Sequence, residues 1–189
     1  MKFLIVDTTY DSSFAVVYDD GKISYDLSRE EKGKTSERIV PFTDGALKKA
    51  GVDKKDLNAV FAVVGPGSFT GIRIGVSFVA ALALGLGVEK AGITTFDGLG
   101  DKADYKIIPS RKGFYYYSVG EETGEVSEED IPSKNVKSRY SAINDVSDET
   151  FADNLCRRAL EIIKKGEYDD VLKPLYLKKS QAERLKDKK

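Results

Sequence analysis

The sequence predicts an α/β fold built around a mixed sheet. Near the N-terminus, residues 3–6 and 13–18 form two short, mostly apolar runs of strand length, and an Asp-Gly turn leads from the second into a third predicted strand at 23–27. Residues 58–64 form another apolar, β-branched run, which leads through a glycine-rich turn into a helical stretch. Three antiparallel strands followed by a helix and a strand–loop–helix unit are typical of a mixed sheet covered by helices.

Two amphipathic helices are predicted from apolar residues that recur every three to four positions. The first covers residues 35–50, is followed by Gly51, and contains Pro41 in its second turn, where we expect only a bend. The second covers residues 149–165 and includes Cys156, the single cysteine, as a packing residue. Both helices have one apolar face, and each is therefore expected to cover a sheet.

The second half of the chain is predicted to form a domain of its own. Residues 101–104 are polar, and strands are expected at 105–108 and 114–119. We therefore divide the chain into a first domain over residues 1–100 and a smaller second domain over residues 101–189.

The glycine-rich turn before the helix at 70–86 is a candidate anion site. Gly65-Pro66-Gly67 ends the strand and Ser68 or Thr70 can cap the helix, so that backbone N–H groups lie at the positive end of the helix dipole. The Gly-Lys-Ser/Thr ending of a Walker loop is absent. A tight strand-to-helix connection that binds nothing fits the same residues about as well.

A second polar segment, Asp7-Thr8-Thr9, follows the first predicted strand. A carboxylate at this position makes metal–phosphate contacts in several α/β folds, but a polar turn is the favoured interpretation of this segment alone. No cofactor is expected, although weak nucleotide binding at the glycine-rich turn stays open. The candidate binding residues are Asp7, Gly65, Gly67, Ser68, Thr70, Gly71 and Arg73.

The helix predicted at 70–86 carries apolar residues on every side, with Arg73 and Ser77 as its polar residues. Such a helix must be covered all round. The uninterrupted apolar run from Ile74 to Val88 is too short to span a bilayer, so no membrane insertion is expected. Small residues along the helix would let another helix approach closely. We therefore expect one face to pack on the sheet and another to meet a partner helix, from this chain or a second one.

Composition excludes several classes of function. The chain has 189 residues, of which 41% are hydrophobic and 32% charged, and its net charge of −1 gives no general affinity for nucleic acid. Because there is no histidine, Ser-His-Asp and Cys-His nucleophile pairs and histidine-bound metals are excluded. One cysteine excludes an internal disulfide and a cysteine-cluster zinc site. The N-terminus lacks the pattern of a signal peptide, and we expect a cytoplasmic protein.

Three further segments carry charge or aromatic runs. Residues 115–117 are three tyrosines close to Arg111 and Lys112, a combination that can stack bases, although tyrosine is also a good strand former. Residues 173–189 hold seven basic residues against two acidic ones, which suits either a nucleic-acid footprint or a solvated tail. The acidic run at 121–130 is expected to be a solvated loop or the margin of a hairpin.

The stretch GPGSFTGIRIG at Gly65 to Gly75 resembles the bacterial TsaB family, also called YeaZ. The resemblance covers nearly the full length of the chain, and its other segments occur in the family's order. They are Asp7-Thr8, Ser36-Glu37 with Pro41, LALGLG at 82–87, SRKG at 110–113 leading to Tyr116, and PLYLK at 174–178.

This resemblance implies an actin-like ATPase fold of two domains, each with an RNase H-like core. TsaB proteins pair with the catalytic subunit TsaD, and with the ATPase TsaE, in making threonylcarbamoyladenosine in tRNAs that read ANN codons. Pairing with TsaD, or with a second TsaB copy as a homodimer, would use the two helices of the first domain, and tRNA would be reached only through the complex. The interface residues implied are Ile39, Phe42, Gly45, Ala46, Ile74, Phe78, Ala81, Leu82 and Gly85.

The resemblance also implies a scaffold without catalytic residues or a metal. TsaD carries a His-His-Met-Glu-Gly-His segment, two of whose histidines hold its metal, and the residues here are Thr94-Thr95-Phe96-Asp97-Gly98-Leu99. Thr95 is a poor metal ligand and Leu99 is none. Where many relatives have Asp-Ala-Arg, this chain has Pro109-Ser110-Arg111, and that carboxylate is lost. The alternatives are an enzyme of the same superfold, a glycoprotease-like M22 metallopeptidase or a phosphotransferase, and a tRNA- or nucleotide-binding module.

Overall fold

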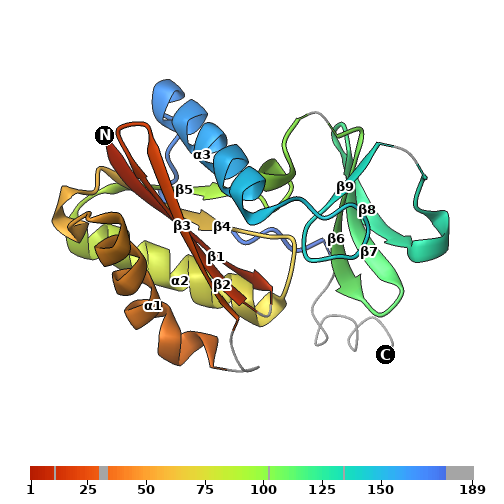
Figure 1. Ribbon diagram of the computed structural model, residues 1–189, viewed down its shortest axis with the longest axis horizontal. Coiled ribbons are helices and arrows are strands. Elements are labelled where there is room, and N and C mark those ends of the chain that lie inside the picture. Colours follow the sequence, from red (N-terminus) through yellow and green to blue (C-terminus); the bar gives the residue numbers. More distant parts are fainter. Residues whose placement is uncertain (11, 30–33, 102, 134, 178–189) are drawn as a thin grey trace.

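Two mixed β-sheets lie side by side in the computed structural model (Figure 1). The structure describes residues 1–10, 12–29, 34–101, 103–133 and 135–177. Within these residues the first sheet has the strand order β3-β2-β1-β4-β5 and the second the order β8-β7-β6-β9. Two sheets of mixed direction flanked by helices confirm the predicted fold class. The basic tail from residue 178 and residues 30–33 of the charged loop lie outside the described residues.

The first sheet combines antiparallel and parallel pairing. Its first three strands form an antiparallel meander, and the last two pair parallel to the first and to each other. Each of the four predicted strands lies in or overlaps one of these elements, and the Asp-Gly turn joins the second and third as expected. The strands are β1 (Lys2–Tyr10), β2 (Ser12–Asp19), β3 (Lys22–Arg29), β4 (Ala59–Val63) and β5 (Glu89–Ile93).

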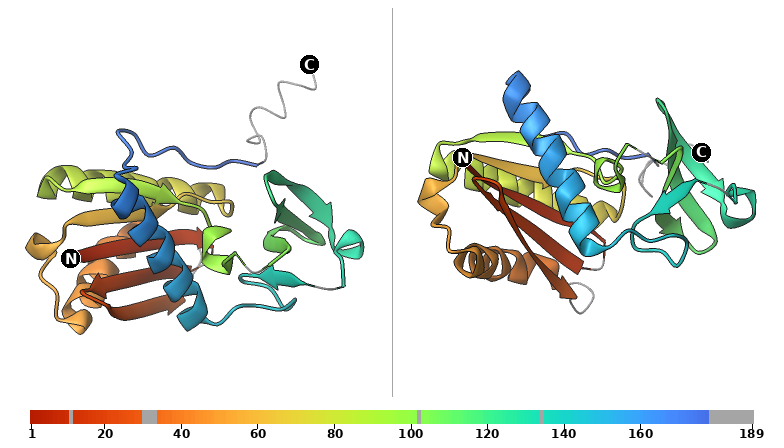
Figure 2. Two further views of the ribbon diagram at one scale, coloured as in Figure 1. Left: turned by 90° about the horizontal axis from the view of Figure 1, so that it is seen from above. Right: turned by 45° about the horizontal axis from the view of Figure 1, so that its top comes forward.

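Helices cover both faces of this sheet. α1 and α2 lie on one face and α3 lies on the other, as the views in Figures 1 and 2 show. The three helices are α1 (Thr35–Ala50), α2 (Phe69–Leu86) and α3 (Asp148–Lys165), and the short 3-10 turns are η1 (Lys54–Asp56), η2 (Asp97–Leu99) and η3 (Glu128–Asp130). α1 keeps Pro41 within its length, as predicted, and ends at Gly51 in the left-handed conformation.

The side chains of β1 alternate between two hydrophobic cores. Phe3 and Ile5 pack in the core under α3, whereas Leu4 and Val6 pack in the core under α1 and α2. Because successive strand residues point to opposite faces and both faces are covered, β1 is apolar without interruption rather than alternating.

Among the helices that the structure describes, α2 is the one whose length and composition would allow it to cross a membrane. In this structure it lies in the helical layer over β1 and β4, where Ile72, Val76 and Val79 are buried in the core. Its start differs by one residue from the predicted Thr70 because Ser68, rather than Thr70, caps the helix by accepting a hydrogen bond from the Gly71 N–H.

The second sheet contains β6 (Tyr105–Arg111), β7 (Phe114–Val119), β8 (Glu122–Ser127) and β9 (Val136–Ser138). β6, β7 and β8 form an antiparallel meander, and β9 pairs parallel to β6. Residues 121–130 were expected to be a solvated loop or the margin of a hairpin, and the loop alternative is wrong because all of β8, the second strand of the β7–β8 hairpin, lies there. β8 is an edge strand in which Glu122 is exposed and Glu125 accepts a hydrogen bond from the Ser110 hydroxyl, and its backbone pairing with β7 needs no apolar side chain.

The second sheet is joined to the first at two places in the chain. The sheets separate between Ile93 and Tyr105, close to the division predicted after residue 100, and that division stays a prediction. α3, which follows the second sheet in the chain, packs back on the first sheet, where Phe151 and Leu155 join the core formed by β1 and β2. By its contacts α3 therefore belongs to the first sheet.

Candidate functional site

The glycine-rich turn after β4 packs tightly against the end of β1. A Cβ atom on Gly67 or Gly71 would lie well under 3.0 Å from the carbonyl oxygens of Thr9 and Thr8. The Thr8 hydroxyl donates to the Gly71 carbonyl at 2.7 Å, and the Ser68 N–H donates to the Thr9 carbonyl at 2.6 Å. The glycines thus let the start of α2 approach β1, and their predicted role in anion binding stays a prediction.

The remaining members of the predicted anion site lie apart from one another. Gly65 accepts a hydrogen bond from the Thr95 N–H, and Thr70 is exposed on the first turn of α2. Arg73 lies on the outer side of α2, where its guanidinium carbon is 5.0 Å from the centre of the Phe69 ring. The structure therefore joins Asp7 to Gly67 and Gly71 through the Thr8-Thr9 backbone but does not bring Arg73 to them.

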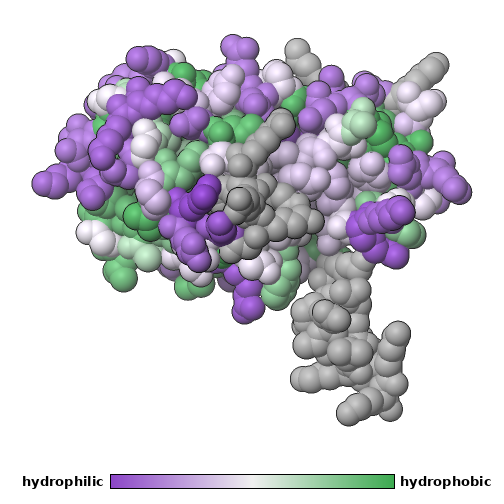
Figure 3. Space-filling model, turned by 60° about the horizontal axis from the view of Figure 1, so that its bottom comes forward, coloured by the Kyte–Doolittle hydropathy of each residue, from purple (hydrophilic) through white to green (hydrophobic). Residues whose placement is uncertain are grey.

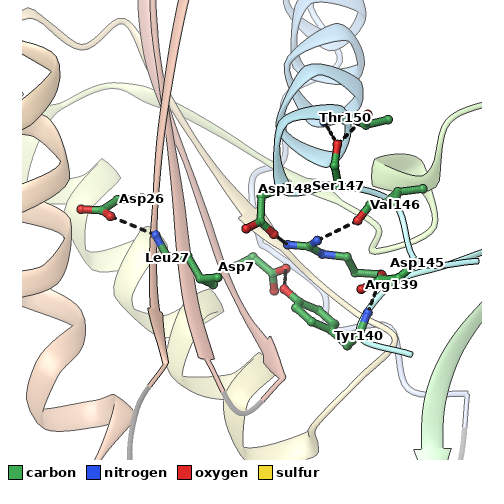
Figure 4. Close-up of polar contacts among 10 residues, drawn as sticks. All are labelled: Asp7, Asp26, Leu27, Arg139, Tyr140, Asp145, Val146, Ser147, Asp148 and Thr150. Atoms are coloured by element: carbon green, nitrogen blue, oxygen red, sulfur yellow. Dashed lines mark hydrogen bonds and ion pairs between the residues drawn. The ribbon is translucent and has the colours of Figure 1, made fainter. Parts of the chain in front are cut away.

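Asp7 is buried between the two sheets, with 1% of its surface exposed. One carboxylate oxygen accepts from the Thr9 N–H at 2.7 Å, and the other accepts from the Tyr140 hydroxyl at 3.0 Å (Figure 4). Burial raises the pKa of this carboxyl, whereas the hydrogen bonds from Thr9 and Tyr140 and the charge of Arg139 lower it. Both oxygens of the predicted site carboxylate are thus engaged within the chain.

Tyr140 comes from the segment between β9 and α3. It has a φ of 62°, in the left-handed region that few residues other than glycine adopt. Its ring stacks on Tyr10 with centroids 4.5 Å apart and planes 2° from parallel. Burial, and then the negative charge of Asp7, raise the pKa of the Tyr140 phenol well above its usual value. The phenol therefore stays protonated and donates to Asp7.

Arg139 completes this buried group, with 3% of its surface exposed. Its guanidinium lies 2.7 Å from a carboxylate oxygen of Asp148 and donates to the Val146 carbonyl at 3.2 Å (Figure 4). The same guanidinium carbon lies 4.4 Å from the centre of the Phe151 ring and 4.6 Å from that of Tyr140. Sequence reasoning missed Arg139 and Tyr140, since neither belongs to a motif and both lie far along the chain from Asp7.

A cleft of about 600 Å³ opens beside this group, between the first sheet and the β6–β7 hairpin. Arg111 lies with its guanidinium carbon 3.5 Å from the centre of the Phe114 ring and also pairs with Glu125 at 3.4 Å. The side chains that matter for its chemistry are Tyr10, Tyr140, Ser110, Arg111, Lys112 and Tyr115.

A second candidate surface lies on α1 and α2. Of the residues predicted to form a helical interface, Ile39 and Ala46 are buried in the core, and Phe42, Ile74, Phe78 and Leu82 are half-buried. Gly45, Ala81 and Gly85 are exposed. Two exposed apolar side chains were missed by the sequence reasoning, Val40 at 59% and Leu84 at 86%.

The half-buried residues of this surface border a groove of about 340 Å³ between α1 and α2. Phe78 and Leu82 of α2 line it opposite Val40, Pro41 and Leu47 of α1. Figure 3 shows this side of the molecule, where hydrophobic residues lie between charged ones. We call this surface, formed by the exposed and half-buried apolar residues of α1 and α2, the α1–α2 face.

Comparison with known proteins identifies relatives of this chain. The family model for TsaD, tRNA N6-adenosine threonylcarbamoyltransferase, matches residues 30–110. The chain is 38% identical over 100 residues to the tRNA threonylcarbamoyladenosine biosynthesis protein TsaB of Buchnera aphidicola subsp. Schizaphis graminum, and 33% identical over 97 residues to that of Escherichia coli. These alignments cover 53% and 50% of this chain. These matches support the assignment of this chain to the TsaB family.

The matches span only part of the curated TsaB relatives. They cover 47% of the Buchnera aphidicola protein and 41% of the Escherichia coli protein. A TsaB protein of Bacillus subtilis is 28% identical over 143 residues, which is 72% of this chain and 62% of that protein. The chain therefore spans about half the length of the first two relatives.

The fold of the TsaB family is shared over almost the whole chain. The structure of YeaZ from Pseudomonas aeruginosa superimposes with a TM-score of 0.73 at 18% identity, covering 93% of this chain and 99% of that one. At this level of identity the likeness establishes the fold alone.

Proposed function

We propose that this chain is a non-catalytic subunit that binds a TsaD-type tRNA N6-adenosine threonylcarbamoyltransferase through the α1–α2 face. The observation that carries the proposal is the exposed apolar surface of α2, where Leu84 is almost fully exposed beside Ala81 and Gly85. Phe78 is half-buried in the adjoining groove. Solvent-facing apolar side chains and a groove on one helix pair favour a protein partner.

The family model supports a related protein as that partner. The TsaD model matches residues 30–110, which include all of α1 and α2, so a TsaD-type protein has a comparable helix pair. Two such pairs can pack face to face about an approximate two-fold axis. A second copy of this chain offers the same surface, and we expect a homodimer when TsaD is absent. TsaE would join the complex, and tRNA would be bound by the complex rather than by this chain alone.

Local packing supports the absence of catalysis at the segment that corresponds to the TsaD metal ligands. The Thr95 hydroxyl donates to the Pro66 carbonyl at 2.8 Å, and Thr95 has no exposed surface. Leu99 is buried in the core under α3. The Asp97 carboxylate accepts from both the backbone and the hydroxyl of Thr94 at 2.7 Å. These side chains hold η2 and the glycine-rich turn in place.

The alternative, a metallopeptidase or phosphotransferase of the same superfold, finds less support. Within the residues that the structure describes, no group of three or more His, Cys, Asp or Glu side chains is placed to hold a metal ion. The Asp7 carboxylate is covered by Tyr140, as described above. The cytoplasmic location stays a prediction.

Light scattering coupled to size-exclusion chromatography tests the proposal on this chain alone and mixed with the TsaD of the same organism. We expect a stoichiometric heterocomplex that replaces a homodimer. Leu84→Asp should weaken both associations strongly while leaving the thermal stability close to that of the natural chain, because Leu84 packs on little within its own chain. Phe78→Asp should also weaken both associations.

Val119→Asp is the matched control, since Val119 is an exposed valine at the end of β7 on the second sheet. It should leave both associations unchanged. A chain that remains monomeric with or without TsaD, or a Leu84→Asp variant that pairs as tightly as the natural chain, would exclude the α1–α2 face as the binding surface.

A further inference from the structure

Arg73 is the single charged residue of α2, and its side chain is exposed. Its guanidinium carbon lies 5.0 Å from the centre of the Phe69 ring, one turn earlier on the same helix. Among the residues that the structure describes, no acidic side chain forms an ion pair with Arg73. α2 therefore presents one positive charge that the described chain leaves unpaired, at the end of a helix whose exposed surface is otherwise mostly apolar.

Two aromatic rings set the position of the Arg73 guanidinium. The Phe69 ring stacks on the ring of Tyr176, with centroids 4.8 Å apart and planes 30° from parallel. Tyr176 belongs to the segment that follows α3, and this segment is attached to the first sheet where the Leu175 N–H donates to the Val64 carbonyl at 2.7 Å. Contacts between distant parts of the chain thus orient the charge before a partner arrives, which lowers the entropic cost of binding.

A depression of about 550 Å³ opens beside Arg73, between the starts of α1 and α2. Ile74, a half-buried residue of the α1–α2 face, lines it, so the depression continues that face. Within the described part of the chain its lining contains no acidic side chain. Three hydroxyl side chains line it together with the guanidinium, those of Ser36, Thr70 and Ser77. This set of hydrogen-bond donors suits an acceptor with negative charge.

A partner that covers the α1–α2 face would take Arg73 out of water together with the apolar residues around it. A guanidinium that is buried without an acid is strongly unfavourable, because its lost hydration is not replaced. A carboxylate placed against it restores that interaction through charge-assisted hydrogen bonds that are often bidentate. The partner that fits this surface therefore carries an Asp or Glu side chain opposite Arg73.

A second copy of this chain is a poor source of such a carboxylate. α2 contains no acidic residue, and α1 contains two, Glu37 and Asp44. Asp44 is already paired with Lys48 at 2.7 Å. The two helices together carry four basic residues, three in α1 and one in α2, against these two acidic ones, so two identical faces repel each other by charge. A related but different helix pair can supply the acid without this repulsion.

We propose that Arg73 determines the specificity of the α1–α2 face by binding a carboxylate of the TsaD-type partner, which favours that partner over a second copy of this chain. Phe69 and Tyr176 act through Arg73 as positioning residues. The inference rests on the proposed function and deepens it. Because one charge makes the distinction, the preference for TsaD should depend on ionic strength, which apolar contacts alone do not explain.

The test measures the dissociation constants of the heterocomplex with TsaD and of the homodimer at low and high ionic strength. Arg73→Gln should weaken the heterocomplex by about tenfold or more, the effect of losing a hydrogen bond between charged groups. It should leave the homodimer unchanged or tighter, and Arg73→Glu should weaken the heterocomplex further. Added salt should weaken the binding of TsaD to the natural chain more than its binding to Arg73→Gln.

Arg38→Gln is the matched control, since it removes the same charge from the neighbouring helix. Arg38 is exposed on α1, lines neither the depression nor the groove, and forms no ion pair within the described chain. This variant should bind TsaD as tightly as the natural chain does. Both arginines are exposed, so thermal unfolding of the variants should stay close to that of the natural chain.

The inference fails if Arg73→Gln binds TsaD as tightly as the natural chain, or if the two respond equally to salt. It also fails if Arg73→Gln weakens the homodimer as much as the heterocomplex, or if Arg38→Gln has the same effect, since overall charge would then be the cause. In each of these cases the proposed function still stands, provided that the natural chain binds TsaD and Leu84→Asp does not. A natural chain that does not bind TsaD would remove both.

Discussion

Replacing Tyr140 with phenylalanine removes one hydroxyl from the contact between the two sheets. That hydroxyl donates to Asp7 at 3.0 Å in a place where Asp7 is almost fully buried, so water cannot readily replace it. A hydrogen bond to a charged group contributes ~1.5–3 kcal/mol. The ring remains available to stack on Tyr10. We therefore expect Tyr140→Phe to lower the free energy of unfolding by about 2 kcal/mol while Asp7 is ionised.

The size of this loss should depend on pH. Burial raises the pKa of Asp7 above 3.8 in the folded chain, against the opposing effects of Thr9, Tyr140 and Arg139. The folded state then holds the proton more tightly than the unfolded state, so the contribution of Asp7 to stability is complete below pH 3.8 and is lost as the pH rises through the folded-state pKa. Tyr140→Phe removes one of the groups that lower this pKa, and the penalty for ionised Asp7 grows.

Urea denaturation of both proteins at pH 7 and at about pH 4 measures the difference. We expect the variant to lose about 2 kcal/mol at pH 7 and less at the lower pH, where the raised pKa leaves a larger fraction of Asp7 protonated in the folded chain. Tyr117→Phe is the control, because its hydroxyl donates to Glu122 on the exposed surface, and it should show no measurable loss. An equal loss at both pH values, or none at pH 7, would refute the reasoning about Asp7.

Three further predictions concern packing and burial. Gly71→Ala should destabilise the chain by about 1–3 kcal/mol in the same urea assay, because the added Cβ would overlap the Thr8 carbonyl oxygen. Asp148→Asn should cost about 1–3 kcal/mol by leaving the buried Arg139 guanidinium without its ion-pair partner, a loss limited by the partial exposure of Asp148. Burial raises the pKa of Cys156 to about 12, so this thiol should not react with a disulfide reagent at pH 8 until the chain is unfolded.

Local sequence patterns predicted the first sheet and its helices well. The Asp-Gly turn marked the β2–β3 hairpin, and the periodicity of residues 35–50 and 149–165 located α1 and α3 to within one residue. These signals are local, since a turn or an amphipathic face is encoded by residues that are neighbours in the chain. β8 was not predicted as a strand, because the six acids of residues 121–130 indicated a solvated loop or the margin of a hairpin.

The candidate site was predicted only in part, because its contacts join distant residues. Asp7 was singled out from its position after the first strand, but its partner Tyr140 is 133 residues away. Nothing local distinguishes a tyrosine that will cover a carboxylate from one that will lie in a strand. The glycine-rich turn was also ambiguous, since glycine serves both close packing and anion binding, and Gly67 and Gly71 are in close contact with β1.

The route of the chain explains why one contact at Asp7 can matter to both sheets. The second sheet is inserted between β5 and α3, and both of these elements pack in the first core. On one side η2 is fixed to α3, where the Asn154 amide donates to the Gly98 carbonyl at 3.0 Å. On the other side Tyr140 and Arg139 fix the segment that returns to α3. Because the insertion is attached at both ends, weakening the Tyr140 contact should leave the first core intact and reduce mainly the rigidity with which the second sheet borders the cleft.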